Sequence, residues 1–167
     1  MIELYDLLEK ISDGKRVMLF LGSGFSIGAK NHNNNRLPIG SQLAKYIYTK
    51  CGIKDGDSDL QFAAEKYIEK YGISALIQSI REIFTIAEYE SYYDSFSQQK
   101  WFRIYTTNYD DLLENIFIKN KKLIDSASIE QDIASYRNKS NLVIHLNGYI
   151  KELSQSNIDN FFKLIGR

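Results

Sequence analysis

The stretch IYTTNYDDLLE, residues 104–114, decides the fold, because an apolar run ends there in a cluster of polar residues and a helical pattern begins at once. The run predicts a buried strand, and the spacing after it predicts a helix over residues 110–119. In parallel sheets, ligands bind at such strand-to-helix junctions. These residues alone leave two interpretations open: Asn108 is only the cap of the helix, with Asp110 and Asp111 near its positive end, or the polar side chains face a ligand.

Two further apolar runs resemble the one that ends in this junction. VMLFLG at residues 17–22 and NLVIHL at residues 141–146 are continuous rather than alternating, as is typical of strands buried on both faces of a parallel sheet. Residues 41–96 between the first two runs show helical spacing, with glycine stops at Gly52 and Gly72. Weaker helical patterns cover residues 2–12 and 128–137.

The order of these elements predicts an α/β fold: a Rossmann-like parallel sheet with helices on both faces and a helical insertion at about residues 41–96. We expect residues 1–167 to form a single domain. Three strands make a narrow sheet, since doubly wound sheets usually have five or more. We therefore expect the sheet to be incomplete in this chain, with its remaining strands after Arg167.

Composition excludes several functional classes. Basic and acidic side chains balance at 21 each, with a pI near 6.7, so nothing indicates direct binding of nucleic acid or of an anionic membrane. The single cysteine, Cys51, excludes an internal disulfide and a four-cysteine zinc site within this chain. We therefore expect no bound metal. We also expect a cytoplasmic protein, because the N-terminus lacks the pattern of a secretory signal.

A glycine-containing turn follows the first predicted strand, in LFLGSGFSIGA at residues 19–29. Gly22 and Gly24 would let the backbone approach a ligand, and a helix after Ser26 would direct free N–H groups toward a phosphate. A plain tight turn is the alternative. The loop lacks the Gly-Lys-Ser or Gly-Lys-Thr ending of nucleotide triphosphatases, and no second strand with a terminal acid follows by about 20 residues as in dehydrogenases. The loop therefore suits a dinucleotide without matching either common enzyme class.

The third junction is VIHLNGYI, residues 143–150. His145 and Asn147 are two positions apart on a predicted strand and so share a face. At the second junction, Asn108 offers both a donor and acceptors, while the carboxylate of Asp110 can accept from ribose hydroxyls or face developing positive charge.

These residues carry a resemblance to a known family. LGSGFS, YTTNYDDLLE and IHLNGYI occur in the order and approximate separation of the three defining motifs of sirtuin-like domains, and PIGSQL resembles the segment after the family's glycine loop. The sequence is most similar to the bacterial anti-phage defence branch, whose members hydrolyse NAD. The resemblance implies that NAD is the substrate or ligand, and that the cofactor-binding set is Gly22, Ser23, Gly24 and Ser26 at the phosphates, with Thr107, Asn108 and Asp110 at the nicotinamide ribose.

The third motif departs from the family pattern. The family has a histidine as general base directly before the glycine, whereas this chain has Asn147, which cannot accept a proton near neutral pH. His145 lies about 6 to 7 Å back along the same strand. It is either a substitute base acting through a water or a histidine packed inside the sheet. Whether Asn147 is natural or engineered stays open.

The resemblance therefore implies a catalytic set of Asn108 and Asp110, with His145 and Asn147 as candidates for the remaining role. The leading hypothesis is an NAD-hydrolysing domain of a larger defence protein, which acts as a homo-oligomer or with further domains. The alternative is a non-catalytic module that senses NAD or ADP-ribose, since the base is replaced. Protein deacylation is disfavoured, because the zinc-binding cysteine pairs of sirtuin deacylases have no counterpart around Cys51.

Overall fold

A computed structural model gives the fold of the chain. It describes residues 9, 17–54, 56, 59–128, 136, 139 and 141–158. The predicted helices at residues 2–12 and 128–137 lie almost wholly outside this part of the chain.

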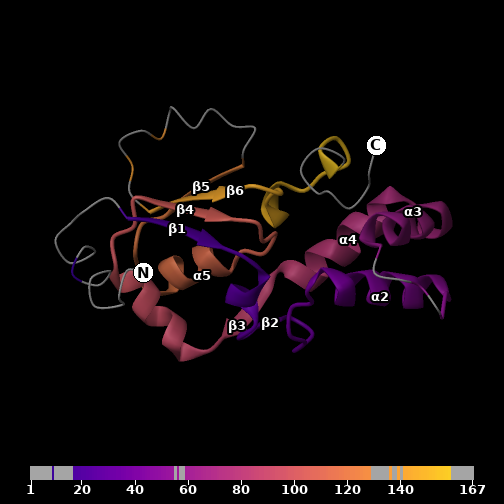
Figure 1. Ribbon diagram of the computed structural model, residues 1–167, viewed down its shortest axis with the longest axis horizontal. Helices are drawn as coiled ribbons and strands as arrows, with labels where there is room; N and C mark the ends of the chain where they lie inside the picture. The colour runs from indigo at the N-terminus through magenta and orange to yellow at the C-terminus, as the bar shows by residue number, and fades with distance from the viewer. Residues whose placement is uncertain are drawn as a thin grey trace.

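Four parallel strands form the main sheet, as predicted for an α/β fold (Figure 1). Their order is β1, β4, β6 and β5. They span Met18–Leu21 (β1), Arg103–Thr106 (β4), Asp125–Ser128 (β5) and Leu142–His145 (β6). The three strands predicted from apolar runs are therefore confirmed. The fourth, β5, was missed because its sequence, DSAS, contains no apolar run.

The sheet's core face is covered by α5 (Leu112–Lys119). Its buried side chains Leu112, Ile116 and Phe117 pack in one cluster with Ile104 of β4 and Val143 of β6. The predicted helix at residues 110–119 is thus confirmed, with a start two residues later. Because all four strands run the same way, their carboxyl ends meet at one edge, to the right in Figure 1.

The opposite face of the sheet carries a smaller apolar cluster. Ala127, Leu142 and Ile144 are buried there. At the edge strand β1, the side chains of Met18 and Phe20 are 60% and 69% exposed. In the described part of the chain, the helices therefore concentrate on the α5 side.

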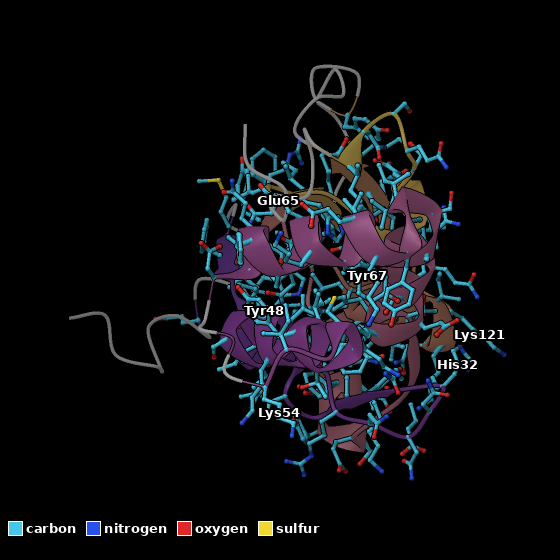
Figure 2. The ribbon with its side chains drawn as sticks, turned by 90° about the vertical axis from the view of Figure 1, so that its right-hand side faces the viewer. His32, Tyr48, Lys54, Glu65, Tyr67 and Lys121 are labelled. Atoms are coloured by element: carbon cyan, nitrogen blue, oxygen red, sulfur yellow. The ribbon has the colours of Figure 1, made fainter. Side chains whose placement is uncertain are left out.

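The helical insertion contains three helices of similar length. They are α2 (Gly40–Cys51), α3 (Leu60–Tyr71) and α4 (Ile73–Phe84). Gly52 ends α2 in the left-handed conformation with φ 82°, and Gly72 separates α3 from α4 with φ 85°. Both predicted glycine stops are confirmed. In Figure 2, α3 with Glu65 and Tyr67 lies across the view, next to α2 with Tyr48. The exposed His32 is labelled in the same view.

The ends of the insertion are joined by a two-stranded antiparallel sheet. Strand β2 (Ala29–Asn31) pairs with β3 (Ile86–Tyr89). The prediction of helix throughout residues 41–96 is wrong here, because the chain after Phe84 turns into β3 and then a 3₁₀ helix, η2 (Ser91–Gln98).

The predicted helix after Ser26 is also absent. Residues Ser23–Ser26 make a single 3₁₀ turn, η1, and the chain then extends into β2. Gly28 serves packing here: an added Cβ would lie 2.2 Å from the Tyr92 hydroxyl and 2.9 Å from the Tyr93 ring. Two tyrosines of η2 therefore require the third glycine of the loop.

Candidate functional site

Asn108 lies at the carboxyl edge of the sheet and is held on three sides. Its side-chain Nδ2 donates to the carbonyl of Gly22 at 3.1 Å and to Oγ of Ser26 at 2.9 Å. Its backbone N–H donates to Oγ1 of Thr106 at 3.0 Å. The interpretation of Asn108 as a helix cap is wrong, because its side chain spans the gap between β4 and the glycine loop instead of turning to α5.

Asp110 continues this hydrogen-bonded chain. The Ser26 hydroxyl donates to its Oδ2 at 2.8 Å, and the backbone N–H of Leu112 at the start of α5 donates to its Oδ1 at 3.2 Å. Burial raises the pKa of Asp110 to about 6, although these two hydrogen bonds act in the opposite direction. A carboxyl group at this edge of the sheet can therefore exchange a proton close to neutral pH.

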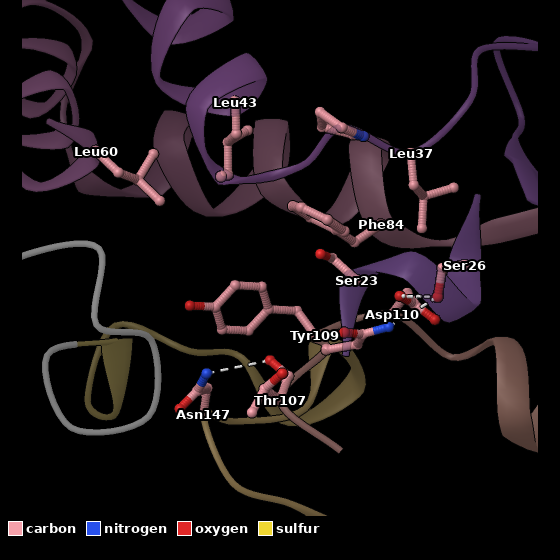
Figure 3. Close-up of a pocket in the computed structure, with 13 residues that line it drawn as sticks. Ser23, Ser26, Leu37, Leu43, Leu60, Phe84, Thr107, Tyr109, Asp110 and Asn147 are labelled. Carbon is pink, nitrogen blue, oxygen red and sulfur yellow. Dashed lines mark hydrogen bonds between the residues drawn. The ribbon is translucent and has the colours of Figure 1, made fainter. Parts of the chain in front are cut away.

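A pocket of about 220 Å³ opens beside these residues (Figure 3). One wall is polar and comes from the ends of the strands. It contains Ser23, Ser26, Thr107, Asn108, Asp110 and Asn147. These six residues were all candidates from the sequence, and the fold brings them together from segments more than 80 positions apart.

The other wall of the pocket is mainly apolar and comes from the helical insertion. Leu43 of α2, Leu60 of α3 and Phe84 of α4 face the polar wall across the pocket. Leu37, Pro38, Gly40 and Tyr109 complete the lining. Sequence reasoning missed this wall. The available signal was the PIGSQL segment, which supplies Pro38, Gly40 and Leu43.

The glycine loop contributes through Ser23 and Ser26, whereas Gly22 and Gly24 are outside the pocket lining. An added Cβ at Gly22 would find its nearest neighbour, Oγ1 of Thr107, at an ordinary 3.8 Å, and one at Gly24 would meet nothing within 4 Å. The fold itself therefore does not require glycine at either position. Since η1 is one 3₁₀ turn, the predicted helix dipole is not available to bind a phosphate.

Asn147, at the position of the family's base, lies on the pocket wall. Its Nδ2 donates to the carbonyl of Thr107 at 3.2 Å. This bond ties the segment after β6 to the segment after β4. It also turns the amide oxygen, which accepts hydrogen bonds, away from that carbonyl.

His145 lies outside the pocket lining. Its side chain is fully buried at 0% exposure. Nδ1 lies 3.1 Å from the carbonyl oxygen of Asn108, and Nε2 lies 3.0 Å from Oε1 of Glu114 on α5. The structure thus places His145 and Asn147 in different surroundings, although they are two positions apart.

The pocket lining carries one carboxyl group, that of Asp110, and neither lysine nor arginine. Within the described residues, no group of three or more His, Cys, Asp or Glu side chains is arranged to hold a metal ion. None of the helices described is long and apolar enough to cross a bilayer.

Comparison with known families agrees with this arrangement. The family model for a SIR2-like domain matches residues 102–161, which include the second and third junctions and the strands β4 and β6. A search of curated proteins finds no match. Residues 102–161 are thus similar to a SIR2-like domain, and the parallel sheet with polar residues at its carboxyl edge supports a sirtuin-like, NAD-related fold.

Proposed function

We propose that the pocket binds the nicotinamide–ribose end of NAD, and that the protein hydrolyses the bond between the nicotinamide and the ribose. The observation that carries this proposal is the position of Asn108. Its two amide hydrogens are committed to Gly22 and Ser26, so its Oδ1 is the side-chain atom that remains for a ligand. In the described part of the chain, that oxygen accepts no hydrogen bond.

The polar wall is therefore rich in acceptors. Asn147 also directs a donor to the backbone, and Asp110 provides a carboxylate. Acceptors of this kind suit the hydroxyl groups of a ribose, which are donors. This supports a sugar-containing ligand more than a purely aromatic one.

The apolar wall and the charge of the site suit the nicotinamide. The oxidised ring is flat and cationic, and it can lie against Phe84 and the leucines of the insertion while Asp110 provides the only carboxylate of the lining. The volume of about 220 Å³ is below the range of about 300–1,000 Å³ typical of pockets that enclose a whole drug-sized ligand. The pocket thus fits one end of NAD, with the phosphates toward Ser23.

The reaction then needs little from the protein beyond positioning and charge. A water molecule attacks C1′ of the ribose, the C1′–N bond breaks, and its electron pair neutralises the nicotinamide nitrogen. Asp110 stabilises positive charge at C1′ as the bond breaks, and Oδ1 of Asn108 orients the ribose or the water. The proton released by the water passes to Asp110, which is the one carboxyl group of the lining.

The test is to incubate the full chain with NAD and measure nicotinamide release by chromatography. We expect release that is lost in Asn108→Ala and retained in Asn120→Ala. Asn120 is a matched control, because its amide also makes two hydrogen bonds, to Asp94 and to the Ile116 carbonyl, away from the pocket. Undiminished NAD with the wild-type chain would contradict the proposal.

A second candidate function is a non-catalytic module that senses NAD or ADP-ribose. The observation that favours it is Asn147, which occupies the pocket wall where the family has its base. Calorimetry separates the two functions. Tight NAD binding without nicotinamide release favours the sensor, whereas binding with release favours hydrolysis.

The cellular setting is part of the same proposal and rests on the resemblance of the motifs. We expect the domain to act in the cytoplasm, in a homo-oligomer or a larger protein that lowers cellular NAD during phage infection. Measuring NAD in infected cells that carry the wild-type gene or Asn108→Ala tests this setting. Sedimentation of the purified protein tests the oligomer.

A further inference from the structure

The two ring nitrogens of His145 each face an oxygen that can only accept. Nδ1 faces the backbone carbonyl of Asn108 at 3.1 Å, and Nε2 faces the carboxylate of Glu114 at 3.0 Å. The same carboxylate oxygen also accepts from the hydroxyl of Ser126. Beside an ionised Glu114, a neutral imidazole has one N–H and would leave one of these contacts without a hydrogen, so the geometry with that carboxylate points to a doubly protonated ring.

We infer that His145 is a buried imidazolium that, paired with Glu114, acts as a positioning residue and fixes the peptide group of Asn108 beside the pocket. This inference rests on the proposed function, in which Asn108 orients the ligand. It assigns no proton transfer to His145. Instead, the imidazolium ring and the carboxylate of Glu114 link the Asn108 peptide group to α5. We call these two side chains together the charged clamp.

The surroundings of the ring are consistent with this assignment. Glu114 faces it from α5 and Asp110 from the second junction, while Tyr149 stacks on it at 4.3 Å between ring centroids. Ser128 of β5 is its register partner across the strand pair. These groups include two carboxyls and no second cation, so the local field favours the charged ring.

The pKa directions follow from the same contacts. Burial alone lowers the pKa of His145, but the hydrogen bond to Glu114 and the charge of that carboxylate outweigh it, and the pKa is raised. Burial alone raises the pKa of Glu114, but the hydrogen bond and charge of His145 outweigh it, and the pKa is lowered. Both directions favour the ionised pair.

The clamp matters because it completes the immobilisation of Asn108. Thr106 holds its N–H, Gly22 and Ser26 hold its amide, and His145 holds its carbonyl. A displacement of about 1 Å in a positioning group costs on the order of 100-fold in rate. Releasing the carbonyl would allow the peptide to rotate and would move Oδ1 away from the ligand.

A clamp and a base differ in the sign of their pH dependence. A histidine that acts as base must be neutral, so activity falls as the pH drops through its pKa. A clamp must be charged, so its contribution persists at low pH and is lost as the pH rises through the raised pKa of His145. The alkaline side of the pH–activity profile therefore shows whether His145 acts as a clamp.

The first experiment uses nuclear magnetic resonance and does not require activity. The chain has two histidines, His32 and His145. In a His32→Gln variant labelled with nitrogen-15, the imidazole signals therefore come from the two ring nitrogens of His145 alone. We expect both ring nitrogens to be protonated at pH 7.5. We also expect the amide N–H of Tyr109, which shares the Asn108 peptide, to titrate with the ring at alkaline pH. A neutral ring at pH 7.5 would overturn the inference even if the protein hydrolyses NAD.

The second experiment compares His145→Gln with Arg103→Gln. Arg103 is a matched control, since it is another buried cation that donates to backbone carbonyls, those of Phe102, Lys139 and Tyr136, at the far end of β4. With equal amounts of folded protein, we expect His145→Gln to lower kcat/KM for NAD about 10- to 100-fold. We expect Arg103→Gln to change it less than about threefold. Equal effects of the two variants, or loss of the acid limb of the pH profile in His145→Gln, would overturn the positioning role. If the wild-type chain proves inactive, the proposed function fails, and the ring protonation still decides whether the clamp exists.

Discussion

The hydroxyl of Ser26 donates a 2.8 Å hydrogen bond to the carboxylate of Asp110, although the two residues are 84 positions apart. Both side chains are buried. The bond joins the glycine loop after β1 to the start of α5, so the position of the carboxylate depends on the loop. Chemistry at Asp110 is therefore sensitive to changes in the loop as well as at Asp110 itself.

Replacement of Asp110 by Asn should stabilise the fold at pH 8 while abolishing NAD hydrolysis. The pKa of Asp110 is raised from 3.8 to about 6, so the folded state loses stability as the pH rises through this interval and the carboxyl ionises. Such a rise corresponds to roughly 3 kcal/mol, which is an upper limit on the gain from Asp110→Asn. Urea denaturation at pH 4 and pH 8 measures it. An equal stability difference between the two proteins at both pH values would contradict the raised pKa.

Replacement of Ser26 by Ala should move the acid limb of the rate profile to higher pH. The Ser26 hydroxyl lowers the pKa of Asp110, so its removal raises that pKa further above about 6. Rates measured between pH 5 and pH 8 test this. Ser97→Ala is the control, because Ser97 is also buried and donates its hydroxyl to a backbone carbonyl, that of Asp94, outside the pocket. We expect its profile to match the wild type.

Replacement of Asn147 by His should increase NAD hydrolysis. Asn147 lines the pocket, and a neutral imidazole there can accept a proton that an amide cannot. General bases contribute about 100- to 10,000-fold, and we expect at least a tenfold gain because the new ring is not positioned by evolution. Nicotinamide release measures it, with Asn147→Gln as the control that lengthens the side chain without adding a base. If Asn147→His binds NAD but its hydrolysis rate does not increase, Asp110 already serves as the general base.

Replacement of Leu60 by Trp should block NAD binding without unfolding the protein. Leu60 is half-buried and faces the pocket from the start of α3, so a larger ring fills the space of about 220 Å³ from the apolar side. Calorimetry with NAD measures the loss, and thermal denaturation checks the fold. Phe62→Trp is the control, since Phe62 is on the same helix but is 47% exposed and outside the lining. Normal affinity in Leu60→Trp would place the ligand elsewhere.

Much of the fold was accessible from the sequence because its main elements bury continuous or periodic apolar residues. β1, β4 and β6 are apolar runs, and α2 to α4 have one apolar face each. The elements that were missed are stabilised by their neighbours instead of by their own composition. β5 is polar but pairs with β6, and β2 forms because it meets β3 across the ends of the insertion.

The candidate site divides in the same way. Its polar wall was predictable, since parallel strands bring their carboxyl ends together and the motif residues follow those ends. Its apolar wall was not, because Leu60 and Phe84 have the helical spacing of ordinary core residues and reach the pocket only through the way three helices pack. The distinction between a helix cap and a bridge at Asn108 likewise depends on Gly22 and Ser26, which are distant in sequence.

The short ribbon of β2 and β3 has a consequence for how such a pocket can diversify. Because Asn31 pairs with Ile86, the chain between them forms a loop whose two ends lie side by side in this ribbon. An insertion whose two ends are paired in this way can change in length or be replaced as a unit. The four-stranded sheet and its hydrogen-bonded polar residues then stay unaltered. The wall that selects a ligand is thereby free to vary independently of the wall that acts on it.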